Sequence, residues 1–599
     1  MTGPSFLQRA AGFSPLDREL ARVIGEGQPA LEATVARLCQ ALRAGHSCLP
    51  LDALAGQSLL DEASVAVFRF PEEAELRQEL SESSAVSIVE PIDPEPHEFR
   101  PVVFDGTRLY LRRYFDQELG IARGIARLAL DGAFSVSPEL EQRISAYFPA
   151  SGGRSDRQRD AVARSLRLRA SLITGGPGTG KTTTVVKVLA LAIERALGAG
   201  RELQIGLLAP TGKASERLLR ATWSAAERLD LPSEVRARLP QESKTIHRAL
   251  GVIPGVKTRF RHTQQDPLPF DLLVVDEASM IDQALMNRLV DAIRPSAQLL
   301  LLGDADQLAS VDAGSVLSEL ALAADTLGDQ ASFSFGISRL TESYRFSGAS
   351  EIMDLATGFR LGQREKIEGA LGGAGGQVAR FEASDLRVPR QSAEFRRWLE
   401  ARVRESLQIG SAEEALAQLE RFQVLCALRS GPWGAEGVNE WVRSLAQGIL
   451  RTRVEGVNYP GRRVMVVENE PRVGLYNGDV GILWPTARGV LEAHFPGDTG
   501  HKRTFSLAEL PAHEDAFAIT IHKSQGSEYD EVALVVPPDA SSALLTRELL
   551  YTGVTRARSR VRLLGSLAVL SEAASRRVER HSGLADKIVQ SSRSSSSTL

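Results

Sequence analysis

The sequence predicts an α/β protein with two tandem lobes, each built on a parallel sheet. A glycine-rich run at residues 175–182 follows the apolar residues 170–173 and fits the phosphate-binding pattern G-x-x-x-x-G-K-[ST]. Further apolar runs at residues 205–209, 272–275 and 299–302 are separated by stretches long enough for helices, which is typical of buried parallel strands. Polar residues follow each run, and doubly wound sheets bind ligands at that end of their strands.

The glycine-rich run is the strongest indication of nucleotide chemistry. Its glycines let successive backbone N–H groups turn toward phosphate oxygens, Lys181 can reach the β and γ phosphates, and Thr182 offers a hydroxyl to Mg²⁺. The alternative is a chance match, and the position between an apolar strand and a helix argues against it. The residues expected to bind ATP here are Gly175, Gly176, Pro177, Gly178, Thr179, Gly180, Lys181, Thr182 and Thr183.

Polar residues at other strand ends predict the catalytic groups of a first lobe over residues 116–350. Asp276 and Glu277 follow the third apolar run, where an Asp holds Mg²⁺ and a Glu polarises the attacking water. An isolated Asp-Glu pair is usually a solvated turn, but the phosphate loop upstream reverses that interpretation. Gln307 is expected to sense the γ-phosphate, and its alternative is a polar residue at a helix start.

A second set of apolar runs, at residues 422–428 and 532–536, predicts a second lobe over residues 351–590. This lobe has no Gly-Lys-Thr of its own, so we expect it to complete the ATP site of the first lobe from across a cleft. Asn477-Gly478 lies between two extended segments, which is a hairpin signal. We therefore predict a small β module inserted at about residues 455–512.

The two ends of the chain carry no evident chemistry. Residues 1–115 show helical patterns, interrupted by the proline-rich stretch 91–96, and are typical of an interaction domain. Residues 591–599 are serine-rich and are predicted to be a disordered tail.

Composition excludes several classes of protein. The 599 residues are 43% hydrophobic and 24% charged with a net charge of −4, which is ordinary for a multidomain protein. No apolar stretch is long enough to cross a bilayer and the N-terminus lacks a secretory signal, so we expect a cytoplasmic protein with no membrane contact. The three cysteines form no C-x-x-C pair, which supports neither a disulfide framework nor a cysteine-based zinc site.

The order of these motifs resembles that of the superfamily 1 helicases and, within them, the RecD family, the alpha subunits of exodeoxyribonuclease V. The resemblance runs through most of residues 109–590. Its carriers are the phosphate loop, Gln158 and the segments Leu109–Tyr114, Ala209–Ala214, Thr245–Arg248, Val274–Met280, Gly303–Leu308, Leu340–Arg345, Asn477–Gly481, Thr520–Glu528 and Tyr551–Ala557. So many motifs in one order make coincidence negligible.

The resemblance implies two RecA-like lobes and assigns roles to single residues. Gln158 would read the adenine edge, and Gly526 and Glu528 would contact the nucleotide. Arg345 and Arg556 would be arginine fingers that the second lobe supplies to the γ-phosphate. The groove for single-stranded DNA would be lined by residues for which ordinary loop capping is the alternative: Thr211, Lys213, Thr245, His247, Thr520, His522 and Lys523.

The activity implied by the resemblance is an ATP-dependent DNA helicase that moves 5′ to 3′ in double-strand break repair and recombination. Its partners would be single-stranded DNA, duplex ends and RecB-like and RecC-like subunits, with residues 1–115 docked to the RecC-like subunit. A small insertion at residues 251–270 would split the duplex or form a solvated loop. The polarity comes from the resemblance alone.

Two other functions stay open from the residues themselves. One is a RecA-like ATPase that remodels protein or RNA, which would not respond preferentially to single-stranded DNA. The other is a motor that has decayed into a structural subunit, and the intact Lys181, Asp276, Glu277 and Arg556 argue against it.

Overall fold

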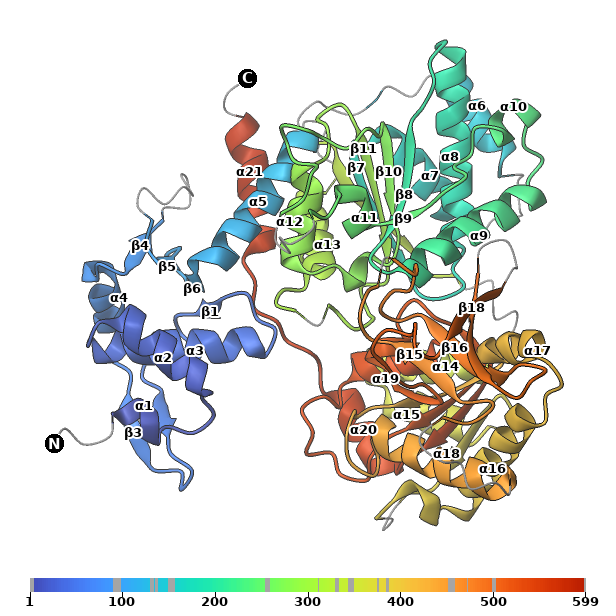
Figure 1. Ribbon diagram of the computed structural model, residues 1–599. Coiled ribbons are helices and arrows are strands. Elements are labelled where there is room, and N and C mark those ends of the chain that lie inside the picture. The colour runs from blue at the N-terminus through green and yellow to red at the C-terminus, as the bar shows by residue number, and fades with distance from the viewer. Residues whose placement is uncertain are drawn as a thin grey trace.

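The computed structural model consists of an N-terminal domain and two α/β lobes, with the N-terminal domain to one side of the first lobe (Figure 1). The structure describes residues 5–89, 99–129, 134, 138–148, 157–253, 259–310, 312–328, 333–342, 350–373, 376–383, 387–450, 458–470, 472–497 and 502–596. Among the helices in these ranges, none has the length and apolar character needed to span a membrane.

The N-terminal domain combines helices with short strands. Its helices confirm the predicted helical region, but the sheet of order β1-β6-β5-β4 and the hairpin β2-β3 were not predicted. Each strand has only two to four residues, which is too short for a recognisable alternation. The elements are α1 (Phe6–Arg9), α2 (Pro15–Gly25), α3 (Pro29–Arg43), β1 (Leu49–Pro50), β2 (Ser58–Leu60), β3 (Ala66–Arg69), α4 (Glu73–Glu82), β4 (Val86–Ile88), β5 (Val102–Phe104) and β6 (Arg108–Leu111).

Helix α5 (Arg112–Ala129) joins this domain directly to the first lobe. Strand β6 ends at Leu111 and α5 begins at the next residue, so the chain passes from one core to the other within a continuous helix. Ile121 and Ile125 of α5 are buried in the core of the first lobe. The predicted boundary between residues 115 and 116 therefore falls inside a helix.

The first lobe contains the predicted parallel sheet, in the order β12-β7-β11-β10-β8-β9. Alternate residues of β10 face opposite layers: Leu273 and Val275 pack in one core cluster, and Leu272 and Val274 pack in the other. Burial on both faces explains the continuous apolar runs in the sequence. The strands are β7 (Ala170–Gly175), β8 (Ile205–Ala209), β9 (Lys244–Thr245), β10 (Leu272–Val275), β11 (Gln298–Gly303) and β12 (Phe335–Leu340).

Helices cover both faces of this sheet (Figure 1). One layer contains α5, α12 and α13 together with the C-terminal helix, and the other contains α7, α8 and α9. The bounds are α6 (Pro138–Ala146), α7 (Arg157–Arg167), α8 (Lys181–Gly198), α9 (Gly212–Arg228), α10 (Ser233–Arg236), α11 (Ile246–Leu250), η1 (Ala278–Met280), α12 (Gln283–Asp291) and α13 (Val316–Leu327).

The second lobe has its own parallel sheet, of order β13-β22-β21-β14-β20. The predicted apolar runs form β14 and β21, which pair with each other at its centre. The strands are β13 (Val378–Phe381), β14 (Phe422–Cys426), β20 (Ala518–Thr520), β21 (Tyr529–Val535) and β22 (Ala557–Leu564), and the helices are α14 (Glu351–Leu361), α15 (Arg364–Leu371), η2 (Pro389–Gln391), α16 (Ala393–Leu407), α17 (Ala412–Ala417), η3 (Gln418–Glu420), α18 (Ala435–Leu450), η5 (His522–Ser524), α19 (Arg547–Val554) and α20 (Leu567–Ser575).

An antiparallel five-stranded sheet is inserted in this lobe, in the order β18-β17-β16-β15-β19. Asp479 N donates to Tyr476 O (3.0 Å) and Gly478 has φ +93°, so a tight turn forms at the predicted position. The turn closes a longer connection, because β15 ends at Val466 and β16 begins at Val480. The strands are β15 (Arg463–Val466), β16 (Val480–Pro485), β17 (Leu491–Pro496), β18 (Lys502–Ser506) and β19 (His513–Asp515).

The C-terminal segment returns from the second lobe to the first, where it ends as helix α21 (Leu584–Ser596) (Figure 1). Leu584 and Ile588 are buried in the core of the first lobe beside α5 and α13. The prediction of a disordered tail from residue 591 is therefore wrong for residues 591–596, which continue this helix. Serine-rich composition was misleading because apolar residues earlier in the helix hold it in place.

A buried ion pair anchors α21. Lys587 Nζ lies 2.7 Å from Glu118 Oε2, and the two side chains are 6% and 0% exposed. Glu118 also accepts hydrogen bonds from Ser47 Oγ (2.6 Å) and Ser582 Oγ (2.8 Å), and Lys587 Nζ lies 3.0 Å from the Tyr110 hydroxyl. Buried charges persist when their remaining hydrogen-bonding groups are satisfied in this way. The network ties the N-terminal domain, α5 and the C-terminal segment together.

A titratable group at the start of α21 predicts that its docking depends on pH. Glu319 on α13 accepts from Ala585 N (3.1 Å), and burial raises the pKa of Glu319 from 4.5 to about 7. The folded state then holds this proton more tightly than the unfolded state. Its contribution is fully present below about pH 4.5 and is lost as the pH rises through 7.

Glu319→Gln should keep the shape and remove the titration. We expect α21 to dock more stably than in the wild type at pH 8, by at most about 3 kcal/mol, and equally well at low pH. Hydrogen exchange of the α21 amides, corrected for intrinsic rates, measures the difference. A difference that is the same at pH 5 and pH 8 would contradict this prediction.

Candidate nucleotide and DNA site

The glycine-rich run forms the loop between β7 and α8. Gly180 has φ +81° and directly precedes α8, so its left-handed backbone leads the loop into the helix. A side chain at Gly175 would place a Cβ 2.5 Å from the carbonyl oxygen of Leu340. The loop is therefore packed closely against the end of β12.

Side chains around the loop hold it in shape. Lys181 Nζ lies 2.5 Å from Gly175 O and 3.1 Å from Gly176 O. Thr179 Oγ1 donates to Gly176 O (2.9 Å), and Gln158 Nε2 on α7 donates to Thr179 O (3.1 Å). Gln158, expected at the adenine, thus lies beside the loop and bonds to its backbone. The remaining predicted residues of the first helical turn, Thr182 and Thr183, are half-buried.

Asp276 and Glu277 lie where β10 ends. Asp276 N donates to Leu208 O (2.9 Å), and Glu277 N donates to Asp276 Oδ1 (2.8 Å). Glu277 has φ +52°, a left-handed conformation that costs a residue with a side chain about 1 kcal/mol and is often found at functional sites. The tight Asp276–Glu277 turn is thus imposed by its surroundings.

The charges around Asp276 include that of Lys181 in the phosphate loop. Burial, reinforced by the charge of Glu277, raises the pKa of Asp276 to about 6, and the positive charges of Lys181 and Arg217 oppose this rise. Asp276 forms no ion pair within the described ranges of the chain. The half-buried carboxylate of Asp276 and the hydroxyl of Thr182 are hard oxygen donors, which fit Mg²⁺.

A buried carboxylate links the two lobes beneath the phosphate loop. The Tyr551 hydroxyl on α19 of the second lobe donates to Asp304 Oδ2 (2.8 Å), and Gln307 Nε2 donates to the same oxygen (3.0 Å). Asp304 is 2% exposed, and burial raises its pKa. A Cβ at Gly176 would lie 3.0 Å from the Tyr551 hydroxyl. Tyr551 was named only as the start of a family motif, without a role, and it contacts the segment that carries Gln307.

Further hydrogen bonds hold this segment between the lobes. Leu308 N donates to Thr552 Oγ1 (3.0 Å), and Gln525 Nε2 donates to Leu308 O (2.9 Å), so the second lobe binds both backbone polar groups of one residue. On the other side, Ala305 N donates to Thr174 Oγ1 (3.3 Å) at the end of β7. Movement of one lobe against the other would therefore act directly on residues 304–308.

A second contact between the lobes joins Arg217 to Glu528. Arg217 Nη2 on α9 lies 2.5 Å from Glu528 Oε1, and Arg558 Nε lies 3.5 Å from Glu528 Oε2. Glu528 was expected at the nucleotide, but its carboxylate is paired with these arginines. Burial lowers the pKa of Arg217, and the charges of Glu528, Glu277 and Asp276 raise it by more. Sequence patterns did not single out Arg217, because its position is recognisable only once the sheet is folded.

The comparisons with known proteins agree with this arrangement. Family models match residues 9–110 (RecBCD enzyme subunit RecD, N-terminal domain), 158–313 (AAA domain) and 515–564 (UvrD-like helicase C-terminal domain). The RecBCD enzyme subunit RecD of Mycolicibacterium smegmatis is 35% identical over 94% of each chain, and that of Mycobacterium tuberculosis is 36% identical over 95% of this chain and 92% of its own length. The chain belongs to the RecD family.

Another relative is named as a DNA helicase. The ATP-dependent RecD2 DNA helicase of Deinococcus radiodurans is 34% identical over 73% of this RecD chain and 52% of its own. Among solved structures, Bacteroides Pif1 bound to single-stranded DNA has a TM-score of 0.38 at 18% identity, covering 68% of this chain and 91% of that one.

Of the two arginines expected as fingers in this RecD, the structure describes Arg556, whereas Arg345 lies outside the described residues. Arg556 is 2% exposed; its Nε donates to Thr552 O (3.1 Å) and its Nη1 to Ser527 O (3.4 Å). In this structure its guanidinium group is therefore bound by carbonyl groups of the second lobe, and reaching a phosphate requires a rearrangement.

The three threonines expected at the DNA of a RecD protein accept local backbone hydrogen bonds, Thr211 and Thr245 as helix caps and Thr520 in a turn. Thr211, Thr245 and Thr520 accept hydrogen bonds through Oγ1 from Ala214 N (3.3 Å), Arg248 N (3.2 Å) and Lys523 N (3.4 Å). This is the capping alternative, but a hydroxyl that accepts still has its own proton to donate. Gly526 lies nearby, since a Cβ there would be 3.8 Å from Thr211 Oγ1. The predicted nucleotide and DNA residues thus meet where the lobes adjoin.

Of the lysines expected at the DNA, Lys213 reaches from the first lobe to the second, whereas Lys523 pairs within the second lobe. Lys213 Nζ lies 5.7 Å from the ring centroid of Tyr529 in the second lobe, and Lys523 Nζ lies 2.5 Å from Glu514 Oε1. Burial lowers the pKa of His247 and of His522, so both imidazoles are neutral near pH 7. These histidines can contact DNA through hydrogen bonds and ring faces rather than through charge.

Proposed function

We propose that the chain is a cytoplasmic ATP-dependent DNA helicase, a 5′-to-3′ motor that uses Mg²⁺-ATP and belongs to a RecBCD-type enzyme acting at broken duplex ends in repair and recombination. Its membership in the RecD family supports the helicase and its RecB-like and RecC-like partners. The observation that carries the mechanism is the phosphate loop of one lobe lying against Tyr551 of the other.

The residues divide the reaction among them. Lys181 neutralises the β and γ phosphates, and Thr182 and Asp276 would hold Mg²⁺, which would supply charge stabilisation when bound. Glu277 orients and polarises the attacking water. Gln307 and Arg345, together with Arg556 from the second lobe, contact the γ-phosphate as the lobes close.

Motion of the DNA follows from the contacts between the lobes. Closing around ATP changes the Asp304–Tyr551 and Arg217–Glu528 contacts, and hydrolysis releases the closed state. The residues expected at the DNA belong to both lobes, so each cycle shifts one set of DNA contacts past the other. Contacts to phosphates and sugars without base readout suit a motor that moves along any sequence.

The test of this function uses the purified chain with duplexes that carry either a 5′ or a 3′ single-stranded overhang. We expect single-stranded DNA to stimulate ATP hydrolysis and unwinding to start from the 5′ overhang. Unwinding from 3′ overhangs alone would contradict the polarity. Stimulation by RNA or unfolded protein rather than DNA would favour a remodelling ATPase, and hydrolysis without unwinding would show that partner subunits are required.

Tyr551→Phe should uncouple nucleotide chemistry from lobe closure. The variant leaves Gln307 as the donor to the buried Asp304 oxygen, so moving Gln307 to the γ-phosphate would leave that carboxylate short of a hydrogen bond. We expect DNA-stimulated kcat to fall about 10-fold, the equivalent of about 1.4 kcal/mol, with a smaller change in KM for ATP. Tyr459→Phe, which alters another buried tyrosine of the second lobe, is the control. Equal effects of the two substitutions on kcat would contradict the prediction.

A further inference from the structure

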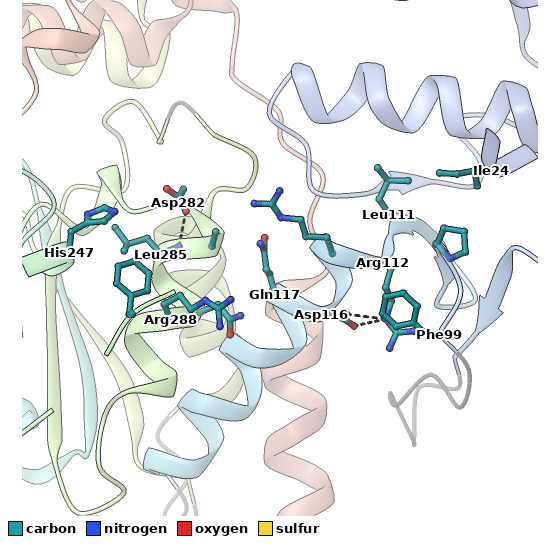
Figure 2. Close-up of a pocket in the computed structure, with 15 residues that line it drawn as sticks. Ile24, Phe99, Leu111, Arg112, Asp116, Gln117, His247, Asp282, Leu285 and Arg288 are labelled. Carbon is teal, nitrogen blue, oxygen red and sulfur yellow. Dashed lines mark hydrogen bonds and ion pairs between the residues drawn. The ribbon is translucent and has the colours of Figure 1, made fainter. Parts of the chain in front are cut away.

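A cavity of about 780 Å³ lies between the N-terminal domain and the first lobe, within the ~300–1,000 Å³ range of ligand sites. In Figure 2, Arg112, Asp116 and Gln117 lie on one side, and His247, Asp282, Leu285 and Arg288 lie on the other. The first group belongs to the start of α5, and the second to α11, α12 and the residue before α12. The cavity therefore lies where the N-terminal domain meets the lobe that carries the phosphate loop.

The charges around the cavity leave two arginines available. Arg112 Nε pairs with Asp116 Oδ1 (2.8 Å), and Asp282 Oδ1 accepts from Leu285 N (2.8 Å) to cap α12. The exposed Arg113 and Arg288 also line the cavity, and neither forms an ion pair within the described residues. The acidic groups are thus occupied locally, while two guanidinium groups can bind an anion.

Aromatic rings accompany these arginines. Phe99 lines the cavity and is 86% exposed, and the Arg112 guanidinium lies 4.9 Å from its ring centroid. On the opposite side, the Phe260 and His247 ring centroids are 5.9 Å apart. Cations beside exposed aromatic rings are the usual means of binding single-stranded nucleic acid without sequence preference.

We propose that this cavity binds single-stranded DNA and extends the groove between the lobes to the N-terminal domain. Arg113 and Arg288 contact phosphates, and bases stack on Phe260 and Phe99. His247 belongs both to the predicted DNA groove and to the cavity wall, so one strand can run from one to the other. The inference rests on the proposed helicase function. It also gives a role to the segment Leu109–Tyr114, which carries the family resemblance without any assigned chemistry.

A protein partner is the main competing occupant, because Leu111, Leu285 and Pro101 give the cavity an apolar surface. Two observations favour DNA. The two exposed arginines without an ion-pair partner among the described residues, Arg113 and Arg288, lie on opposite walls, and His247, a residue expected at DNA, also lines the cavity. Aromatic and apolar surface also suits the faces of bases, which are themselves apolar.

Salt dependence of binding tests the proposal. The full-length chain carrying Arg113→Ala and Arg288→Ala is titrated with fluorescent dT oligonucleotides at several salt concentrations. Each lost phosphate contact on a single strand lowers the slope of log K against log salt by about 0.7, so the double variant should lose about 1.4. The ratio of wild-type affinity to variant affinity should therefore fall about 7-fold as the salt concentration rises from 50 to 200 mM. A slope equal to that of the wild type would overturn the proposal.

The matched control is Arg396→Ala with Arg404→Ala. These two exposed arginines lie on α16 of the second lobe and likewise form no ion pair in the described ranges, so the control makes the same change in charge away from the cavity (Figure 1). We expect it to retain the wild-type slope. A slope that falls equally in both double variants would reveal a general effect of net charge and would overturn the proposal that the cavity binds DNA.

Oligonucleotide length and cross-linking locate the contact. The loss of DNA affinity caused by Arg113→Ala with Arg288→Ala should increase with oligonucleotide length, once the strand is long enough to extend beyond the groove between the lobes. Oligonucleotides with 5-iodouracil should cross-link to peptides that contain Phe99 or Phe260 in the wild type, and cross-links confined to the lobe junction would contradict the proposal. Wild-type DNA binding by the double variant, with loss of assembly with RecB-like and RecC-like subunits, would assign the cavity to a protein.

The outcomes separate this inference from the proposed function. If no oligonucleotide stimulates ATP hydrolysis by the wild-type chain, the helicase function itself fails. If DNA stimulates hydrolysis and the double variant behaves as the wild type in slope, length dependence and cross-linking, the cavity proposal alone fails.

Discussion

Lys181→Ala should lower DNA-stimulated ATP hydrolysis by about 100-fold or more, the effect of removing one well-placed charge donor from a transition state. Lys181 begins α8, and its ammonium group lies against the carbonyl oxygens of Gly175 and Gly176. Its charge also opposes the rise in the pKa of Asp276, so its removal makes that carboxylate harder to ionise. The substitution therefore weakens the site for phosphate and the site for Mg²⁺ together. Steady-state hydrolysis with saturating dT oligonucleotide measures the loss.

Lys366→Ala is the control for this change. Lys366 is an exposed lysine on α15 of the second lobe, and its replacement removes the same charge far from the phosphate loop. It should retain wild-type hydrolysis. Binding of a fluorescent ATP analogue should weaken in Lys181→Ala only. Retention of more than about a tenth of the wild-type rate by Lys181→Ala would refute the assigned role of the loop.

Glu277→Gln should abolish turnover by a different route. If Glu277 polarises the attacking water, its loss should lower kcat by about 10²- to 10⁴-fold, because that is the usual contribution of a general base. Glutamine has nearly the same shape and can remain in the left-handed turn that Glu277 occupies. Nucleotide binding should therefore persist while hydrolysis stops. Single-turnover hydrolysis and binding of the fluorescent ATP analogue, measured on the same preparation, separate the two steps.

The control for Glu277 is Glu234→Gln. This substitution makes the same chemical change at an exposed glutamate of α10 in the same lobe, where the side chain pairs with Arg238. It should leave kcat and ATP binding unchanged. If Glu277→Gln lost nucleotide binding as completely as Lys181→Ala does, Glu277 would be a structural part of the loop rather than the group that activates water.

The sheets of both lobes were predictable because parallel strands covered on both faces are continuously apolar. Residues 272–275 and 299–302 show this pattern, and they became the neighbouring strands β10 and β11. Short strands escaped notice: β1 has two residues, and no alternation can be seen over that length. Strand β12 pairs in parallel with β7, but polar residues interrupt its apolar sequence.

In the candidate site, too, residues with a local sequence signal were predicted and residues that depend on long-range contacts were not. Lys181, Asp276 and Glu277 were found because they follow strands at fixed local spacing, and local spacing is visible in a sequence. Arg217 and the role of Tyr551 were missed, because each residue becomes significant only through a partner more than two hundred residues away. Long-range contacts of this kind leave no signal in a single sequence.

By itself, the sequence predicted the nucleotide chemistry of this protein, since the phosphate loop is a local pattern and the Asp-Glu pair follows a strand downstream of it. It also determined the two parallel sheets, through their apolar runs. Only the tertiary structure decided that the serine-rich end forms helix α21 and packs in the first lobe, and that Glu528 pairs with Arg217. The physical reason is distance along the chain: packing and ion pairing join residues that no local pattern connects.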